Sequence, residues 1–193
     1  MSGPADGSFS RRGFLGEAIK LVAQQAGSLL AEKMAPRRHF RPPGALPEPA
    51  FLAVCTRCGY CTEACPVHAI VSAPSPAGLA AGTPIIEPTV QPCVACEGMF
   101  CASVCPTGAL VPPVDGWAKE KLGDLVLDAE RCIAFQGIEC GVCVRVCPIG
   151  PDALDLDEKG RPVIRSGCVG CGVCVRACVT SPSSLGLSLA EDY

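Results

Sequence analysis

Cysteine is the residue type whose number and spacing point most directly to chemistry in this sequence. The chain has 16 cysteines in 193 residues, and all of them fall into four short motifs. Motif I (55–65), CTRCGYCTEAC, has the spacing C-x2-C-x2-C-x3-C and is followed by proline. Motif II (93–105) reads C-x2-C-x4-C-x3-C and motif III (132–147) reads C-x7-C-x2-C-x3-C, and both also precede proline. Motif IV (168–178) keeps the first spacing but precedes valine. A motif that occurs four times calls for a single chemical explanation.

Disulfides and zinc explain these spacings poorly. An even number of cysteines is typical of disulfide frameworks in exported proteins, but such frameworks do not require the same local spacing four times. A bridge between cysteines three positions apart, such as Cys55 and Cys58, is also geometrically unfavourable. Zinc favours paired C-x2-C units with four ligands per ion. It explains neither the further cysteines of each motif nor the proline.

The spacing C-x2-C-x2-C-x3-C-P is typical of bacterial ferredoxins with two [4Fe–4S] clusters. The first three cysteines wrap one cluster, and the fourth, at the start of a helical turn, binds a second cluster. Proline suits the next position because its φ is fixed and it needs no partner for an N–H. At four cysteines per cluster, the chain is predicted to hold four [4Fe–4S] clusters. The predicted metal ligands are all sixteen cysteines: Cys55, Cys58, Cys61, Cys65, Cys93, Cys96, Cys101, Cys105, Cys132, Cys140, Cys143, Cys147, Cys168, Cys171, Cys174 and Cys178.

The elements that must position these loops are expected to be short. Apolar runs at 125–127 and 162–165 predict brief strands, and residues 152–164 predict a hairpin that turns at Lys159-Gly160. A short helix is expected within 115–130, and residues 67–86, which contain three prolines, are predicted to form an irregular loop. The predicted fold class is α+β, with tandem or nested two-[4Fe–4S] ferredoxin-like modules that are small and loop-rich. Aromatic residues make up only 5% of the chain, so bound clusters are expected to supply cohesion that packing alone does not.

A few other side chains lie in or near the motifs. His68 and Gly108 occupy equivalent places after the proline, where a positive φ is expected because both residue types tolerate one. His68 as a ligand is the alternative, which would leave a cysteine spare. Tyr60 and Phe100 either shield the clusters from water or serve in ordinary packing, and Trp117 is expected in the core.

Composition argues against several classes of function. The net charge is −3, with no basic run beyond Arg37, Arg38 and Arg41, so nucleic acid is not an expected partner. No membrane-spanning helix is evident, since prolines interrupt the uncharged stretch 67–86. The sequence has no nucleotide-binding glycine loop and no pairing of a nucleophile with a base. These features predict an electron carrier, not an enzyme with its own substrate site.

The N-terminal region predicts export. Ser10-Arg11-Arg12-Gly13-Phe14-Leu15 places paired arginines ahead of a mildly apolar stretch, as in twin-arginine signals. An exposed amphipathic helix that happens to hold two arginines is the alternative. We divide the chain into a twin-arginine signal region (1–35), a proline-rich tether (36–50) in which His39 is solvated, and a four-cluster ferredoxin domain (51–193).

With these residues in view, the chain resembles the NapG/MauM family of twin-arginine-exported ferredoxin-type proteins. The resemblance rests on the twin-arginine start, RPPGALPE before motif I, PCVACEGMFCASVCPTGAL, CIAFQGIECGVCVRVCP and the proline-free motif IV. It implies a periplasmic iron–sulfur protein that relays electrons from a membrane-bound quinol dehydrogenase to a periplasmic cytochrome or reductase. In the NapG branch the destination is a periplasmic nitrate reductase, and in the MauM branch the setting is methylamine oxidation. Association with the membrane would come through the partner, without a transmembrane span.

Two alternatives remain for the function. One is an assembly or maturation factor for a periplasmic redox enzyme. The other is the electron-transfer subunit of a molybdenum oxidoreductase, which also carries four such motifs. Subunits of that type usually lack their own export signal, so Arg11-Arg12 argues against it.

The motifs can share clusters in two ways. Sequential pairing, I with II and III with IV, is supported by the short gap between Cys147 and Cys168. Nested pairing, I with IV around II with III, is supported by a resemblance to the molybdenum oxidoreductase subunits, whose second motif has the same lengthening. We expect nesting. Cys105 would then join the first three cysteines of motif III, and Cys147 those of motif II, while Cys65 and Cys178 would be exchanged between motifs I and IV.

Overall fold

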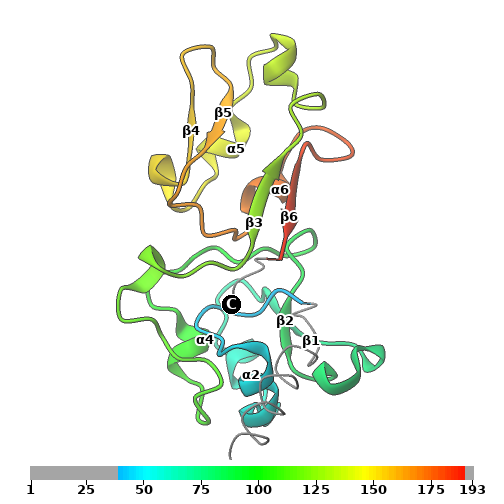
Figure 1. The fold of residues 1–193 in the computed structure, drawn as a ribbon, viewed down its shortest axis with the longest axis vertical. Coiled ribbons are helices and arrows are strands. Elements are labelled where there is room, and N and C mark those ends of the chain that lie inside the picture. The colour runs from blue at the N-terminus through cyan, green and yellow to red at the C-terminus, as the bar shows by residue number, and fades with distance from the viewer. Residues whose placement is uncertain (1–38, 190–193) are drawn as a thin grey trace, which may run out of the picture. The chain divides into compact units, whose positions relative to one another are not determined.

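The computed structural model describes residues 39–189, all of which belong to one compact unit that begins at residue 37. The twin-arginine segment lies outside the described residues. The described chain consists of two modules, each of which has a β-hairpin between two short helices (Figure 1). We call residues 39–118 the first module and residues 119–189 the second module.

The first module contains motifs I and II. Its elements are short and are connected by loops, as the spacing of the motifs predicts. In chain order they are α2 (Glu48–Val54), α3 (Tyr60–Glu63), β1 (Ile70–Ser72), the 3₁₀ turn η1 (Ser75–Ala80), β2 (Pro84–Ile86), α4 (Phe100–Ser103) and the 3₁₀ turn η2 (Gly116–Ala118).

The second module contains motifs III and IV. In chain order its elements are β3 (Asp124–Leu127), η3 (Ile133–Gln136), α5 (Val142–Arg145), η4 (Gly150–Asp152), β4 (Leu154–Leu156), β5 (Pro162–Ile164), α6 (Val173–Ala177) and β6 (Leu185–Ser188). The strands expected at 125–127 and 162–165 are therefore confirmed as β3 and β5. The short helix expected before β3 is the single turn η2.

The helical turn of each motif begins after a residue with a left-handed backbone. Gly59 (φ 84°) precedes α3, Gly141 (φ 73°) precedes α5 and Gly172 (φ 89°) precedes α6. Glycine adopts this conformation without the steric cost that a Cβ brings. In motif II, which is one residue longer, Met99 takes this place at φ 39°, and its side chain is buried.

A hairpin joins the two motifs of each module. β1 pairs antiparallel with β2, and β4 pairs antiparallel with β5, which confirms the hairpin predicted at 152–164 with Gly160 (φ 74°) at its turn. The irregular loop predicted for 67–86 is wrong, because strands of three residues stand at both ends of the connection that holds its first two prolines. Pro74 and Pro76 lie in the connection, and Pro84 begins a strand of a two-stranded sheet, where a missing N–H is tolerated.

The outer strands close each module. In the second module β3 pairs antiparallel with β6. In the first module the same role falls to the segment before motif I, since Ala45 pairs with Leu110 and the N–H of Leu46 donates to the carbonyl of Ala109 at 3.1 Å. The extended tether predicted for 36–50 is therefore wrong for residues 40–50, which complete the first module. The ferredoxin domain predicted for 51–193 therefore begins before Phe51.

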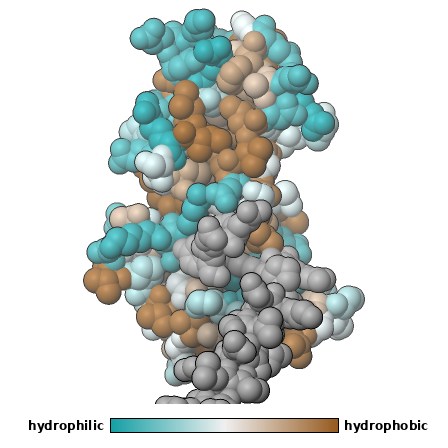
Figure 2. Space-filling model, viewed as in Figure 1, coloured by the Kyte–Doolittle hydropathy of each residue, from teal (hydrophilic) through white to brown (hydrophobic). Residues whose placement is uncertain are grey.

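The core is built largely from small side chains and cysteines, because the chain has few aromatics. Phe51 is fully buried, and one continuous buried cluster joins motifs I and II to Val169 and Cys171 of motif IV. Hydrophobic side chains also reach the surface over the strands of the second module (Figure 2). Between residues 39 and 189 the structure contains no helix with the length and apolar character needed to cross a membrane.

One charged side chain belongs to this core. Arg41 is 1% exposed, and its Nε donates to Glu48 Oε2 at 2.9 Å. It also donates to the hydroxyl of Thr83 and the carbonyl of Pro84, and its guanidinium lies 4.5 Å from the ring centre of Phe51. A buried charge needs such complete pairing, so Arg41 fixes the segment before motif I onto the first hairpin.

Candidate metal centres

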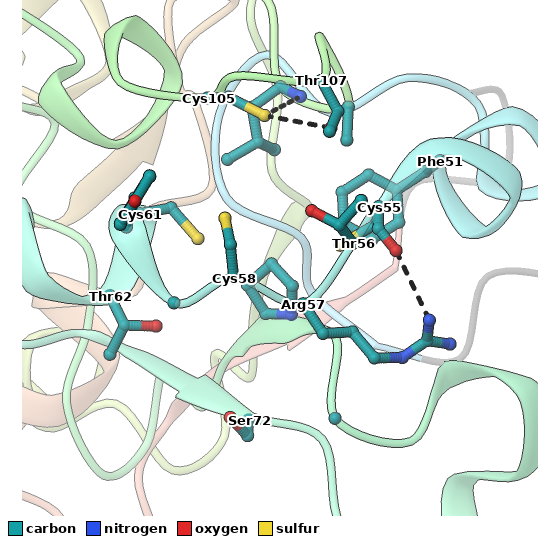
Figure 3. A pocket seen from close by; sticks show the side chains of 16 residues that line it. Phe51, Cys55, Thr56, Arg57, Cys58, Cys61, Thr62, Ser72, Cys105 and Thr107 are labelled. Carbon is teal, nitrogen blue, oxygen red and sulfur yellow. Dashed lines mark hydrogen bonds between the residues drawn. The ribbon is translucent and has the colours of Figure 1, made fainter.

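Four predicted ligands from two motifs line one cavity in the first module (Figure 3). Cys55 and Cys58 come from the loop before α3, Cys61 lies within α3, and Cys105 comes from the end of motif II. The cavity has a volume of about 460 Å³, including open space at its mouth, and Phe51 contributes to its apolar lining. All sixteen cysteines lie within the described residues, and Cys58 is the one that is exposed. The first cavity therefore opens to solvent beside Cys58.

The second module has an equivalent cavity. Cys168, Cys171 and Cys174 of motif IV line it together with Cys147, the fourth cysteine of motif III. Apolar side chains complete the lining, among them Leu125, Ile149, Leu154 and Val169. The two cavities share one plan, in which three sulfur atoms come from one loop and the fourth comes from the partner motif.

The nested pairing of the motifs is therefore wrong in this structure. Cys105 lines the cavity of motif I and does not join motif III, and Cys147 lines the cavity of motif IV and does not join motif II. The physical reason is the hairpin between consecutive motifs. β1 with β2 brings α3 against α4, and β4 with β5 brings α5 against α6, so each module closes locally.

The other eight cysteines fall into two further groups, and we name each site by the motif that supplies three of its sulfur atoms. Site II comprises Cys93, Cys96 and Cys101 with Cys65. Burial raises the pKa of Cys101, and the charge of Cys65 is among the neighbouring charges that raise it further. Site III comprises Cys132, Cys140 and Cys143. Burial raises the pKa of Cys143, and the charges of Cys132 and Cys140 raise it further. The shared plan of the modules assigns Cys178 to site III. Sites I and IV are those of the two cavities.

Backbone N–H groups point at the fourth cysteines of the first module. The N–H of Ala69 donates to Sγ of Cys65 at 3.3 Å, and that of Leu110 donates to Sγ of Cys105 at 3.4 Å. These bonds form where the chain turns back after the proline. His68 has φ 51° and Gly108 has φ 69°, so the positive φ predicted at both positions is confirmed.

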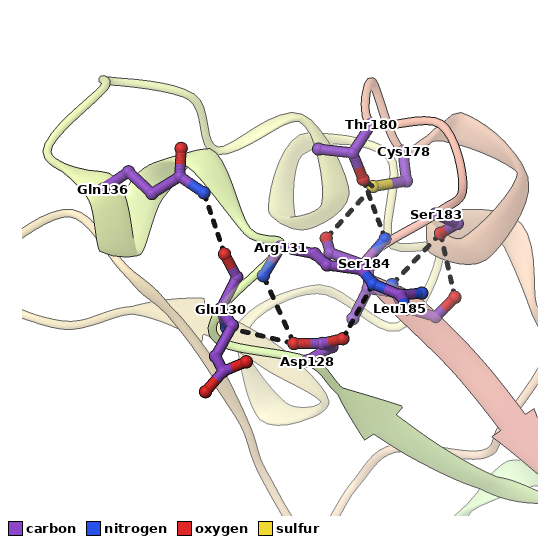
Figure 4. A network of polar contacts seen from close by, with 9 residues as sticks. All are labelled: Asp128, Glu130, Arg131, Gln136, Cys178, Thr180, Ser183, Ser184 and Leu185. Atoms are coloured by element: carbon purple, nitrogen blue, oxygen red, sulfur yellow. Dashed lines mark hydrogen bonds and ion pairs between the residues drawn. The ribbon is translucent and has the colours of Figure 1, made fainter.

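Two hydroxyl groups lie close to the sulfur of Cys178 (Figure 4). Its Sγ lies 3.2 Å from the hydroxyl of Thr180 and 3.3 Å from that of Ser184. The carbonyl of Ser184 accepts from the N–H of Asp128, whose own carbonyl accepts from the N–H of Cys132, so Cys178 is linked to the start of motif III. The sequence analysis missed both hydroxyls. The signal was the polar run TSPSS that follows Val179 where the other motifs have proline.

The pKa values of several cysteine thiols are shifted by their surroundings. Burial, with the charges of neighbouring cysteines, raises the pKa of Cys93, Cys101 and Cys174 to about 12. At Cys178 burial also acts to raise the pKa, but the hydroxyls of Ser184 and Thr180 outweigh it and lower the pKa to about 6. Thiols gathered in this way ionise together only if positive charge lies between them.

The donor set fits a [4Fe–4S] cluster. Such clusters take four thiolates, are held in largely apolar surroundings and accept hydrogen bonds at their sulfur ligands. In residues 39–189, no three or more His, Cys, Asp and Glu side chains form a group that could hold a single metal ion. The thiols line cavities instead.

The aromatic residues of the motifs lie mostly at the surface. Tyr60 is 53% exposed and borders the first cavity, and Phe100 is 51% exposed. Trp117 is partly buried against the core, as predicted, and its Nε1 donates to the carbonyl of Cys96 at 2.9 Å. Trp117 thereby holds the loop of motif II.

The comparisons with known families identify iron–sulfur domains over the cysteine motifs. A model described as a 4Fe-4S dicluster domain matches residues 54–109 and again 92–150, and a second model of the same description matches residues 124–179. The first and last of these matches cover the paired motifs of the first and second modules.

Individual relatives are similar over most of the chain. The ferredoxin-type protein NapG of Escherichia coli is 38% identical over 164 residues, which cover 81% of this chain and 71% of that protein. The methylamine utilization ferredoxin-type protein MauM of Paracoccus denitrificans is 42% identical over 142 residues, covering 69% of this chain and 63% of that protein. MauM of Methylorubrum extorquens is 39% identical over 166 residues, which cover 80% of this chain and 76% of that protein.

Proposed function

Because this chain belongs to the family of NapG and MauM ferredoxin-type proteins, we propose that it carries electrons through four [4Fe–4S] clusters held by its sixteen cysteines. Each cluster supplies a one-electron centre whose potential depends on hydrogen bonds to sulfur and on exposure to solvent. The chain's own residues hold the centres, exclude water from them and place N–H and hydroxyl donors at the ligand sulfur atoms.

The observation that carries this proposal is the make-up of the two cavities. Each is lined by three cysteines of one motif and the fourth cysteine of its neighbour, which is how two-cluster ferredoxins share their ligands. The shared plan of the modules extends the same ligand set to sites II and III.

We further propose a place for the protein in a respiratory chain. It receives electrons from a membrane-bound quinol dehydrogenase and delivers them, through a periplasmic cytochrome or directly, to a periplasmic reductase of the nitrate reductase type. Export by the twin-arginine route fits this role, because clusters are assembled in the cytoplasm and that route is the one expected for a folded, loaded protein. Membrane association then comes through the partner.

Deletion of the gene tests the relay. Without the protein, quinol-dependent reduction of the terminal acceptor should slow, while the terminal reductase assayed with an artificial electron donor should keep its activity. The purified, reduced protein should be oxidised by a partner and should turn over no small substrate alone. Undiminished quinol-dependent reduction in the deletion strain would contradict the relay.

An assembly or maturation factor is the second candidate, and the same strain separates it from the relay. Loss of such a factor would leave the terminal reductase inactive with every donor, artificial ones included. The exposure of Cys58 at the mouth of the first cavity favours the relay, because electron exchange with a partner needs a centre close to the surface.

A further inference from the structure

The loop of motif IV packs against the first module. Val169 and Cys171 belong to the same buried cluster as Cys93 and Cys101 of motif II. At the end of α6, Nη1 of Arg176 donates to Oε1 of Gln91 in the first module at 2.8 Å. Motif IV is therefore held to the segment that leads into motif II.

Gly172 lies close to the first module in this contact. A Cβ added at Gly172 would lie 2.6 Å from Cβ of Pro88 and 3.1 Å from Cδ1 of Leu187. A Cβ contact with Pro88 at 2.6 Å is too short for a packed interior, so a larger residue would push the loop away. Gly172 directly follows Cys171, and Pro88 lies on the segment that leads to Cys93. The contact therefore joins the two segments that carry these cysteines.

Motif III lies farther from the first module. Cys143 and Cys147 pack on a separate buried cluster with Leu154, Cys174 and Leu185, and that cluster lies within the second module. Figure 1 shows α6 between α5 and the first module.

We propose that Gly172, by its contact with Pro88, positions the ligands of site IV beside those of site II, so that the four sites lie in the spatial order I, II, IV, III. This order differs from the order of the motifs in the sequence. Site I stands at one end, where Cys58 is exposed, and site III stands at the other. This inference rests on the proposed function, because it treats the cysteines as ligands of [4Fe–4S] clusters.

Two full-length double variants test the order. Cys58→Ser with Cys140→Ser leaves complete ligand sets at sites II and IV, and Cys58→Ser with Cys168→Ser leaves complete sets at sites II and III. Each should retain about eight irons. After reduction with dithionite, electron paramagnetic resonance should show magnetically interacting centres in the first variant and isolated centres in the second. Isolated centres in the first variant, or interaction only in the second, would overturn the proposal.

Substitution of Gly172 tests the positioning role. In the first double variant, adding Gly172→Ala should weaken the magnetic interaction while the iron content stays the same. Adding Pro88→Gly as well removes the atom that the new Cβ meets, so the interaction should recover although the backbone strain at residue 172 remains. An unchanged interaction in the Gly172→Ala protein would show that this contact does not set the spacing.

Crystals of the loaded wild-type protein provide a second measurement if the variants lose their clusters. An iron anomalous difference map should place the two inner iron peaks at the loops of Cys93 and Cys171. A motif III peak between them would contradict the order. Fewer than four iron peaks, or mononuclear metal at the cysteines, would instead overturn the proposed function, so the two failures are distinguishable.

Discussion

Leu46 and Ala109 are joined by a backbone hydrogen bond of 3.1 Å, from the N–H of Leu46 to the carbonyl of Ala109. A second bond of 2.7 Å runs from the N–H of Val111 to the carbonyl of Gly44. The segment before motif I is thereby tied to the segment after motif II, as β3 is tied to β6 in the second module. The first module is complete only when residues 40–46 are included.

Arg41→Ala should destabilise this module strongly. The substitution removes the partner of Glu48, whose side chain is only 10% exposed, and leaves hydroxyl and carbonyl groups without their donor. Removing one member of a buried ion pair costs about 3–5 kcal/mol. The urea concentration that bleaches half of the visible absorbance should fall accordingly.

Lys119→Ala is the matched control for this substitution. It breaks an ion pair with Asp115 in which the lysine is 78% exposed, and exposed pairs contribute about 0–1 kcal/mol. The two variants are compared by their urea midpoints. If Arg41→Ala lowers the midpoint no more than Lys119→Ala does, residues 40–46 do not stabilise the module.

The pairing of the motifs predicts which cysteine substitutions are equivalent. Cys105→Ser and Cys58→Ser should alter the same paramagnetic signal, since both cysteines line the first cavity. Cys147→Ser and Cys171→Ser should likewise alter one common signal. Nested sharing would make Cys105→Ser resemble Cys140→Ser instead, and comparison of the reduced spectra distinguishes the two patterns.

The ligand motifs and the local backbone conformation could be predicted from the sequence, because both depend on residue type and spacing. The four motifs, the positive φ at His68 and Gly108 and the hairpin at 152–164 follow from spacing and backbone preferences alone. The pairing of the motifs was not readable in this way, because C-x2-C-x2-C-x3-C has the same form whichever motif supplies the partner. The role of residues 40–46 was also hidden, since prolines and glycine describe an outer strand and a tether equally well.

The hydroxyl groups at Cys178 should raise the potential of site III. They lie 3.2 Å and 3.3 Å from its sulfur and stabilise negative charge there, which is greater in the reduced state. Thr180→Val and Ser184→Ala should each lower the potential of one centre by tens of millivolts, since about 59 mV corresponds to about 1.4 kcal/mol for one electron. A redox titration followed by electron paramagnetic resonance measures the shift.

Ser103→Ala is the control for loss of a hydroxyl group. Its Oγ donates to the carbonyl oxygens of Gly98 and Met99 and to no sulfur, so the potentials should stay the same. Equal shifts in Ser103→Ala and Ser184→Ala would show that the hydroxyls at Cys178 have no specific effect.

Export should depend on the paired arginines near the N-terminus. Arg11→Lys with Arg12→Lys should keep the cluster-loaded protein in the cytoplasm, as expected for a twin-arginine signal. Arg37→Lys with Arg38→Lys, a second arginine pair in the same chain, should leave export unchanged. Fractionation of cells measures both, and periplasmic protein from the first variant would rule out a twin-arginine signal.

Iron and acid-labile sulfide analysis of the anaerobically purified wild-type protein tests the central claim most directly. Sixteen cysteines shared among four sites predict about sixteen irons and about sixteen sulfides per chain. The brown absorbance of the protein should bleach with dithionite. Stoichiometric zinc without sulfide would contradict the assignment of all four sites, whereas the predicted count would establish that every cysteine motif holds its cluster.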